Sequence, residues 1–116
     1  MEPRDSRLAK NEAVFREVNE RVVGITQEFG SLGDRPSEPV GGLICECSDP
    51  GCLERVGPLT ISEYETVRRD PLRFIIAPNH QALDVETVVE QHTSYWIVEK
   101  HEGVPADVAR ARDPRN

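Results

Sequence analysis

The sequence has 116 residues, so we expect one domain with short appendages, because domains typically contain about 100 to 150 residues. Acidic residues outnumber basic residues by 21 to 14, which gives a formal net charge of −7. This charge argues against nucleic acid as a partner, since it would repel a phosphate backbone. No apolar run approaches the roughly 20 residues that span a bilayer, so we expect no membrane contact.

The first ten residues, MEPRDSRLAK, lack the apolar segment of a secretion signal. The chain has three cysteines, and three thiols cannot all pair within one chain. We therefore expect a cytoplasmic protein. In that reducing compartment, clustered cysteines bind metal or perform redox chemistry more often than they form structural disulfides.

An N-terminal amphipathic helix is predicted over residues 1–30, because apolar residues recur at alternating steps of three and four. The positions on this face are Leu8, Asn11, Phe15, Val18, Val22, Ile25 and Phe29. Two ion pairs at i,i+4 spacing, Glu12 with Arg16 and Glu17 with Arg21, are predicted on the solvent side of the helix.

The stretch GSLGDRPSEPVGG follows, and its glycine, proline and serine predict a flexible linker over residues 31–41. Residues 42–102 are predicted to form a small zinc-stabilised α+β domain, with a short antiparallel sheet of three to four strands and one short helix. The tail, residues 103–116, is polar, and we expect it to be disordered.

Local patterns place the elements of this domain. Residues 42–47 are predicted as a strand that leads into the cysteines. The stretch PLTISEYETVRRDP predicts a helix, since Thr60 and Glu63 have the spacing of a capping box. LRFIIAP predicts a buried strand, and VETVVEQ and YWIVEK predict a hairpin that turns across HTS.

Three cysteines lie close together as C-x-C-x4-C, at Cys45, Cys47 and Cys52. Thiolates are soft ligands that suit zinc, and structural zinc sites have four ligands. The intervening SDPG favours a tight turn that aims several sulfurs at one point. A domain of about 60 residues is marginal on hydrophobic burial alone, so we predict one structural zinc ion per chain.

The fourth ligand is predicted to be His80, because it lies in a turn after an apolar strand, as a sequence-distant ligand often does. His92 in the hairpin connection and His101 at the end of the last strand are alternatives, as are Asp49 and water. Glu46, between two cysteines, either tunes the site through hydrogen bonds or faces solvent.

Two other interpretations of the cysteines remain open. They could be small buried hydrophobic residues, because free cysteine is often buried. They could also form a redox group without metal, in which two neighbouring thiols oxidise to a disulfide.

Three stretches, ICECSDPGC, LTISEYETVRRDPLRFIIAPNH and VETVVEQHTSYWIVEK, resemble a set of short uncharacterised bacterial proteins, chiefly actinobacterial. Their pattern is CEC-x4-C, LTxxEY, DPxxF, a PxH turn that usually reads PGH, and a terminal VVEK. The resemblance covers roughly residues 43–100 and implies that His80 is the partner of the cysteines, with no established activity. Asn79 stands where the pattern has glycine, and asparagine also accepts a left-handed backbone.

These observations favour a small zinc-binding module that acts by protein–protein contact, with a regulatory role. The long helix would meet another protein or a second copy through its Leu8–Phe29 face, although packing against its own domain is the alternative. A second hypothesis is a thiol-based redox sensor that releases zinc when its cysteines are oxidised. An enzyme ranks third, because a zinc ion with three cysteines and one histidine has no open position.

Overall fold

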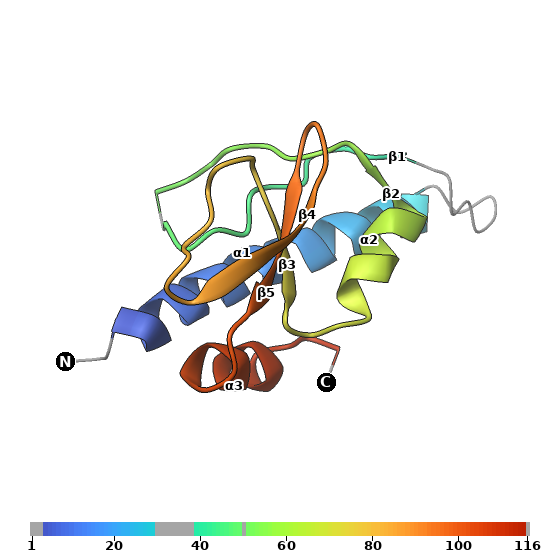
Figure 1. Ribbon diagram of the computed structural model, residues 1–116. Coiled ribbons are helices and arrows are strands. Elements are labelled where there is room, and N and C mark those ends of the chain that lie inside the picture. Colours follow the sequence, from blue (N-terminus) through green and yellow to red (C-terminus); the bar gives the residue numbers. More distant parts are fainter. Residues whose placement is uncertain (1–3, 30–38, 50, 116) are drawn as a thin grey trace.

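The computed structural model describes residues 4–29, 39–49 and 51–115, and over these residues the chain folds as an α+β protein (Figure 1). The predicted fold class is confirmed. In chain order the elements are α1 (Arg4–Phe29), β1 (Pro39–Val40), β2 (Leu59–Thr60), α2 (Ile61–Arg68), β3 (Arg73–Ile76), β4 (Glu86–Gln91), β5 (Trp96–Lys100) and α3 (Val104–Ala111). They include two small antiparallel sheets, β1-β2 and β3-β5-β4.

The larger sheet contains the predicted buried strand and the predicted hairpin. Strand β5 is central, and Val98 lies opposite Phe74 of β3 and Val88 of β4. The hairpin turns where HTS predicts it, and the His92 backbone N–H donates to the Tyr95 carbonyl at 2.9 Å. The inward side chains of β3 and β5 are buried, so this sheet supplies much of the apolar core.

Helix α2 begins with the predicted capping box. The Thr60 hydroxyl accepts from the Glu63 backbone N–H at 3.1 Å, and the Thr60 N–H donates to the Glu63 carboxylate at 2.8 Å. These bonds satisfy two backbone donors that a helix start otherwise leaves free. Leu59 before the helix and Tyr64 within it are both buried in the core.

The segment around the cysteines is less regular than predicted. Residues 42–47 form no strand, and their one ladder contact is a bridge between Ile44 and Arg55. Most of the predicted linker, residues 31–38, lies outside the described residues. The last residues of the predicted linker differ from the prediction, because Val40 is buried and pairs with Leu59 in the β1-β2 sheet.

Helix α1 forms as predicted, but a different face is buried. The buried positions are Ala9, Glu12, Ala13, Arg16, Asn19 and Val23. Most of them follow a position of the predicted face by one residue, so the buried face is rotated by about 100° around the helix axis from the predicted one. In consequence Val18 and Ile25 are exposed. The side chain of Phe29 lies outside the described residues.

The buried face of α1 differs from the predicted one because the protein interior offers partners for the polar side chains of this helix. Arg16 is completely buried and donates to the carbonyls of Pro71 and Ala109, both at 2.7 Å. Buried Glu12 pairs with Lys100. The predicted surface pair of Glu12 with Arg16 is therefore wrong, whereas Glu17 and Arg21 do pair on the surface, at 3.2 Å. Polar groups can be buried when every charge finds such a partner.

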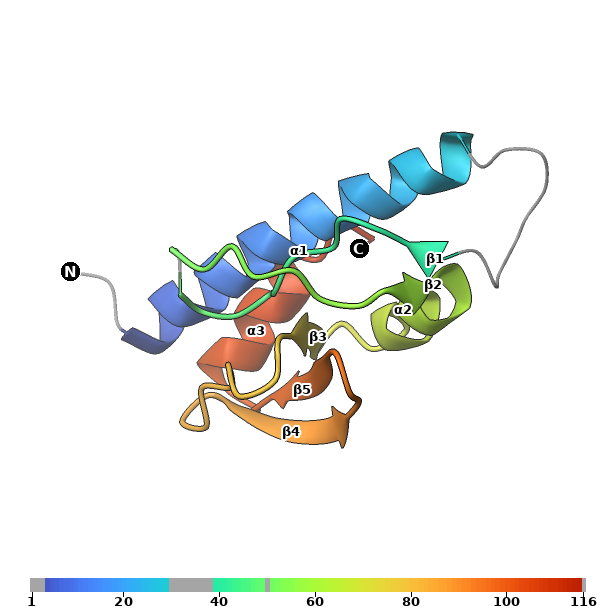
Figure 2. The ribbon, with the colours of Figure 1, turned by 90° about the horizontal axis from the view of Figure 1, so that it is seen from above.

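The prediction of a disordered tail over residues 103–116 is also wrong for the part described. Helix α3 lies alongside α1 (Figure 2), and its Ala106 and Ala109 are buried. Beyond it, Asp113 accepts from Arg68 at 2.5 Å and Arg115 donates to Glu20 at 2.7 Å. The helix is buried through small alanines, which allow close packing between helices. Because it has few large apolar residues, its sequence does not show the apolar pattern by which core elements are predicted.

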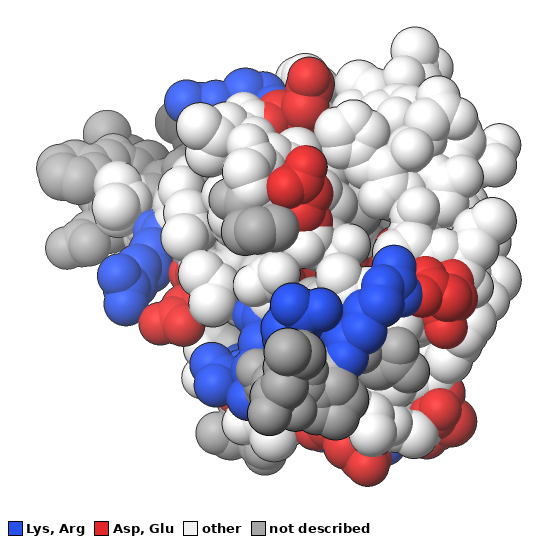
Figure 3. Space-filling model, turned by 90° about the vertical axis from the view of Figure 1, so that its left-hand side faces the viewer, with Lys and Arg blue, Asp and Glu red and all other residues white. Residues whose placement is uncertain are grey.

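The surface carries charges of both signs. On the face shown in Figure 3, basic and acidic side chains are interspersed over the lower part, and the upper right is largely free of them. Among the described helices, none is long and apolar enough to cross a membrane.

Candidate metal centre

The cysteines lie on an extended segment and the turn after it. Cys45 and Cys47 flank Glu46, whose side chain points to the opposite side, as alternate residues of an extended chain do. The Asp49 carboxylate accepts from the Gly51 N–H at 2.9 Å, and the Cys52 N–H donates to the Asp49 carbonyl at 3.0 Å. This tight turn returns Cys52 towards the other two sulfurs.

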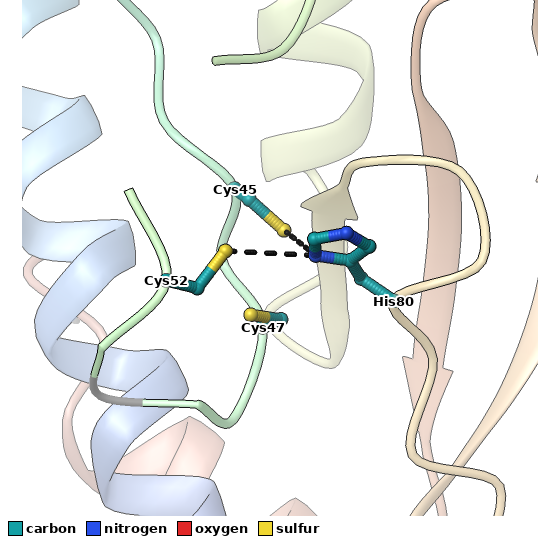
Figure 4. A group of neighbouring side chains, drawn as sticks. All are labelled: Cys45, Cys47, Cys52 and His80. Atoms are coloured by element: carbon teal, nitrogen blue, oxygen red, sulfur yellow. Dashed lines mark hydrogen bonds between the residues drawn. The ribbon is translucent and has the colours of Figure 1, made fainter. Parts of the chain in front are cut away.

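The loop after β3 presents His80. Its backbone N–H donates to the Ala77 carbonyl at 3.1 Å, which closes a turn. Asn79 occupies the left-handed region with a φ of 71°, which is the conformation that its place before His80 predicts. The ring of half-buried His80 points its Nδ1 atom at the sulfurs (Figure 4).

The structure brings Cys45, Cys47, Cys52 and His80 together, with all four candidate ligand atoms within 4.8 Å of one another. His80 Nδ1 lies 3.6 Å from Cys45 Sγ and 3.5 Å from Cys52 Sγ (Figure 4). For a tetrahedral ion with zinc-like bond lengths, a nitrogen and a sulfur ligand lie about 3.6 Å apart. The group therefore forms a possible metal-binding site.

The other histidines lie elsewhere. His92 Nε2 contacts the Glu90 carboxylate at 3.0 Å, and its ring stacks on Tyr95. His101 Nε2 contacts the Thr87 hydroxyl at 2.9 Å. Asp49 is exposed and binds the backbone of its own turn. Of the four candidates for the fourth position within the chain, His80 is the one that faces the sulfurs.

The three buried thiols have different acidities. The hydrogen bond from the Cys45 thiol lowers the pKa of Cys47 to about 5. The same bond raises the pKa of Cys45, and burial raises the pKa of Cys52. Because the pKa values of Cys45 and Cys52 are raised, a bound cation would have to displace protons from these two thiols. The Ala77 N–H donates to Cys45 Sγ at 3.1 Å, which stabilises charge on that sulfur.

Glu46 is buried, so its predicted solvent-facing role is wrong. One carboxylate oxygen accepts from the Ile75 N–H at 2.9 Å, and the other accepts from Asn19 Nδ2 of α1 at 2.7 Å. Asn19 was not among the predicted functional residues. The sequence feature that could have revealed it is helical spacing, which places Asn19 on the same face of α1 as Glu12, Arg16 and Val23, and this face is buried.

The fold and site together define a small α+β domain with a Cys3His cluster that could hold a metal ion. Comparison of the chain with protein-family models, with curated proteins and with solved structures finds no match. The resemblance stated from the sequence stays a prediction.

Proposed function

We propose that this chain is a cytoplasmic zinc-stabilised module that acts by contact with another protein, in a regulatory role. The observation that carries the zinc part is the convergence of three sulfurs and His80 Nδ1 within 4.8 Å of one another, with two nitrogen–sulfur distances that fit a tetrahedral ion. Three thiolates and one imidazole are a usual ligand set for structural zinc. These four ligands complete the coordination, so the proposed role is structural, with no position for an activated water.

A structural ion would stabilise a described segment that has little secondary structure. Among the described residues between β1 and β2, the ladder contact is the single bridge of Ile44 with Arg55. A bound zinc ion would join this segment to the loop that carries His80. Structural zinc contributes roughly 10–16 kcal/mol of apparent folding free energy in zinc-finger peptides. That exceeds the usual net stability of about 5–15 kcal/mol.

The proposed contact face is the outer side of α1, within the predicted Leu8–Phe29 stripe. Val14, Val18 and Ile25 are 49%, 40% and 53% exposed, and their spacing puts them along one side of the helix. Neighbouring large apolar side chains on an exposed helix favour contact with another protein or a second copy. The charge of both signs around them does not favour nucleic acid.

A redox sensor is the alternative, and the position of the sulfurs favours it. Cys47 and Cys52 are buried, but each lines an open hollow that His80 also lines, and a small oxidant would approach the sulfurs through these hollows. Two thiolates would give two electrons to peroxide and form one disulfide. The peroxide would take up two protons and become two waters, and the ion would be released.

The proposal is tested by metal analysis of the full chain, purified without added metal. We expect about one zinc per chain and thiols that react only after denaturation or chelation. Sub-stoichiometric metal with three freely reacting thiols would contradict the zinc site. Exposure to dilute peroxide then separates the two roles, because a structural site keeps its zinc, whereas a sensor releases it reversibly.

A further inference from the structure

Helix α1 contacts the cysteine segment through one buried side chain. The Asn19 amide is completely buried, and its Oδ1 accepts from the Ile44 N–H at 2.9 Å. Its Nδ2 donates to the Ile44 carbonyl at 2.8 Å. Both backbone hydrogen-bonding groups of the residue before Cys45 are therefore bound by Asn19, which takes the place of a neighbouring strand.

The same amide also reaches the residue between the two cysteines. Asn19 Nδ2 donates to the Glu46 carboxylate at 2.7 Å, and the other Glu46 oxygen accepts from the Ile75 N–H of β3 at 2.9 Å. The Glu46 N–H donates to the Ile75 carbonyl at 2.8 Å. The C-x-C segment is thus fixed on one side to α1 and on the other side to β3.

This arrangement determines where two of the sulfurs point. In an extended segment, Glu46 faces one side while Cys45 and Cys47 face the other. When the Glu46 carboxylate is anchored at both oxygens, rotation of the segment is restricted, and the two sulfurs keep their direction towards His80. A second amide, Asn11 Nδ2 of α1, donates to the Ser48 carbonyl at 3.1 Å and fixes the residue after Cys47.

We propose that Asn19 and Glu46 are positioning residues of the metal centre, and that through them the docking of α1 and the binding of the metal reinforce each other. This inference rests on the proposed zinc site. A ligand loop held in its bound conformation binds more tightly, because less conformational freedom is lost on binding. Coupling between two events is reciprocal, so zinc in turn stabilises the attachment of α1.

The test measures zinc affinity of the full chain by competition with a chromophoric chelator. Asn19→Ala removes all three hydrogen bonds and is expected to weaken zinc binding about 10–100-fold, as changes around metal ligands do. Val23→Ala is the matched control, because Val23 is also buried on α1 but lies in the apolar core. We expect Val23→Ala to destabilise the fold with less than about threefold change in zinc affinity.

Glu46→Gln provides a second variant in case Asn19→Ala does not fold. Glutamine keeps the shape of Glu46 but offers an amide group where two donors, Asn19 Nδ2 and the Ile75 N–H, require two acceptors. We expect weaker zinc binding and an altered visible spectrum when Co²⁺ replaces zinc, since that spectrum reports ligand geometry. In the double variant the two losses should not add, because they break one shared contact.

Zinc affinities of Asn19→Ala and Glu46→Gln within about threefold of the native value would overturn the inference while leaving the zinc site intact. The inference would equally be overturned if Val23→Ala lost as much affinity as Asn19→Ala, because zinc binding would then follow general stability. If the native chain binds no zinc, both the proposed function and this inference are wrong.

Discussion

Two regions of this protein are held together by different means. Around the cysteines, over the described residues between Gly41 and Pro58, one bridge, a few backbone bonds and the side chains of Asn19 and Glu46 connect the chain, and the candidate metal ligands meet there. Where α1 packs against α3 and β5, charged side chains are buried in pairs. Lys100 lies between Glu12 and Glu86, with its Nζ 2.6 Å from the Glu86 carboxylate.

The difference between the regions lies in what satisfies their polar groups. In the region of α1, α3 and β5, every buried ion has a protein partner of opposite charge or a backbone carbonyl. Buried ion pairs of this kind add little net stability, but the loss of one partner is costly. In the cysteine region, the three thiols face His80 and one another, with no charged side chain of the described residues to balance thiolates, and the Ala77 N–H donates to Cys45, so a cation would complete the site. Each region should therefore respond to its own kind of perturbation.

The largest effect is expected from His80→Ala, which removes one of the four candidate ligands. Without it the ion is expected to dissociate, and the free energy of unfolding should fall by about 5 kcal/mol or more, part of the roughly 10–16 kcal/mol that structural zinc contributes. Zinc content and thermal unfolding measure both effects. His92→Ala is the matched control, because exposed His92 lies away from the sulfurs. If His92→Ala lost the metal and His80→Ala kept it, the assignment would be wrong.

Lys100→Met breaks the buried charges of the other region. It leaves Glu12 and Glu86 buried without their cation, and it should lower the free energy of unfolding by about 3 kcal/mol. Zinc affinity should change by less than about threefold, because α1 contacts the cysteine segment through Asn19 and not through Glu12. Arg110→Met removes an exposed ion pair with Glu102 and should cost less than about 1 kcal/mol. Chemical denaturation measures both variants, and a loss of zinc affinity in Lys100→Met would show that the two regions are not separate.

Glu12→Gln tests the same charges through pH. Burial, with the nearby Glu86 carboxylate, raises the pKa of Glu12 well above 4.5. Between pH 4.5 and its folded pKa, Glu12 holds a proton in the folded chain that it releases in the unfolded chain, and above that range it is the charged partner of Lys100. This contribution to stability is complete below pH 4.5 and is lost as pH rises through the folded pKa.

Relative to Glu12→Gln, the native chain should lose up to about 1.4 kcal/mol of unfolding free energy per pH unit in this window. Denaturation at saturating zinc and several pH values measures the difference. The exposed Glu17→Gln is the control. A difference between native chain and Glu12→Gln that does not change with pH would contradict the proposed protonation.

The smallest effect on stability is expected from Val18→Glu on the outer face of α1. Val18 is exposed, so the free energy of unfolding should change by no more than about 0.5 kcal/mol. Association with a second copy or a partner should be lost, because the charge would enter the contact. Light scattering detects self-association, and Val89→Glu on β4 is a control of similar exposure. If Val18→Glu and Val89→Glu associated equally well, α1 would not be the contact face.

Features that depend on neighbouring residues could be predicted from the sequence. The capping box joins Thr60 and Glu63, three positions apart, and the β4-β5 hairpin connects adjacent strands, so both are visible in local patterns. The cysteine cluster is equally local. The choice of His80 required a contact 35 residues away from Cys45, and its place after a buried strand was enough to suggest it.

Features that depend on distant partners could not be predicted. Glu12 meets Lys100 across 88 residues, and Arg16 meets the Ala109 carbonyl across 93 residues. Without knowledge of these partners, the apolar pattern of α1 indicates burial of Val18 and Ile25. The same contacts explain α3, because the carbonyl that Arg16 needs comes from a segment whose alanines give no apolar signal.

Hydrogen–deuterium exchange of the zinc-loaded and the chelator-treated full chain tests most directly whether a metal holds the cysteine region. The Cys45 and Val56 N–H groups bond within that region, whereas the Lys100 N–H donates to the Leu72 carbonyl in the other. We expect chelation to speed exchange at Cys45 and Val56 at least tenfold more than at Lys100, a difference of about 1.4 kcal/mol in local opening. Equal exchange at all three amides with and without zinc would contradict a metal-held region.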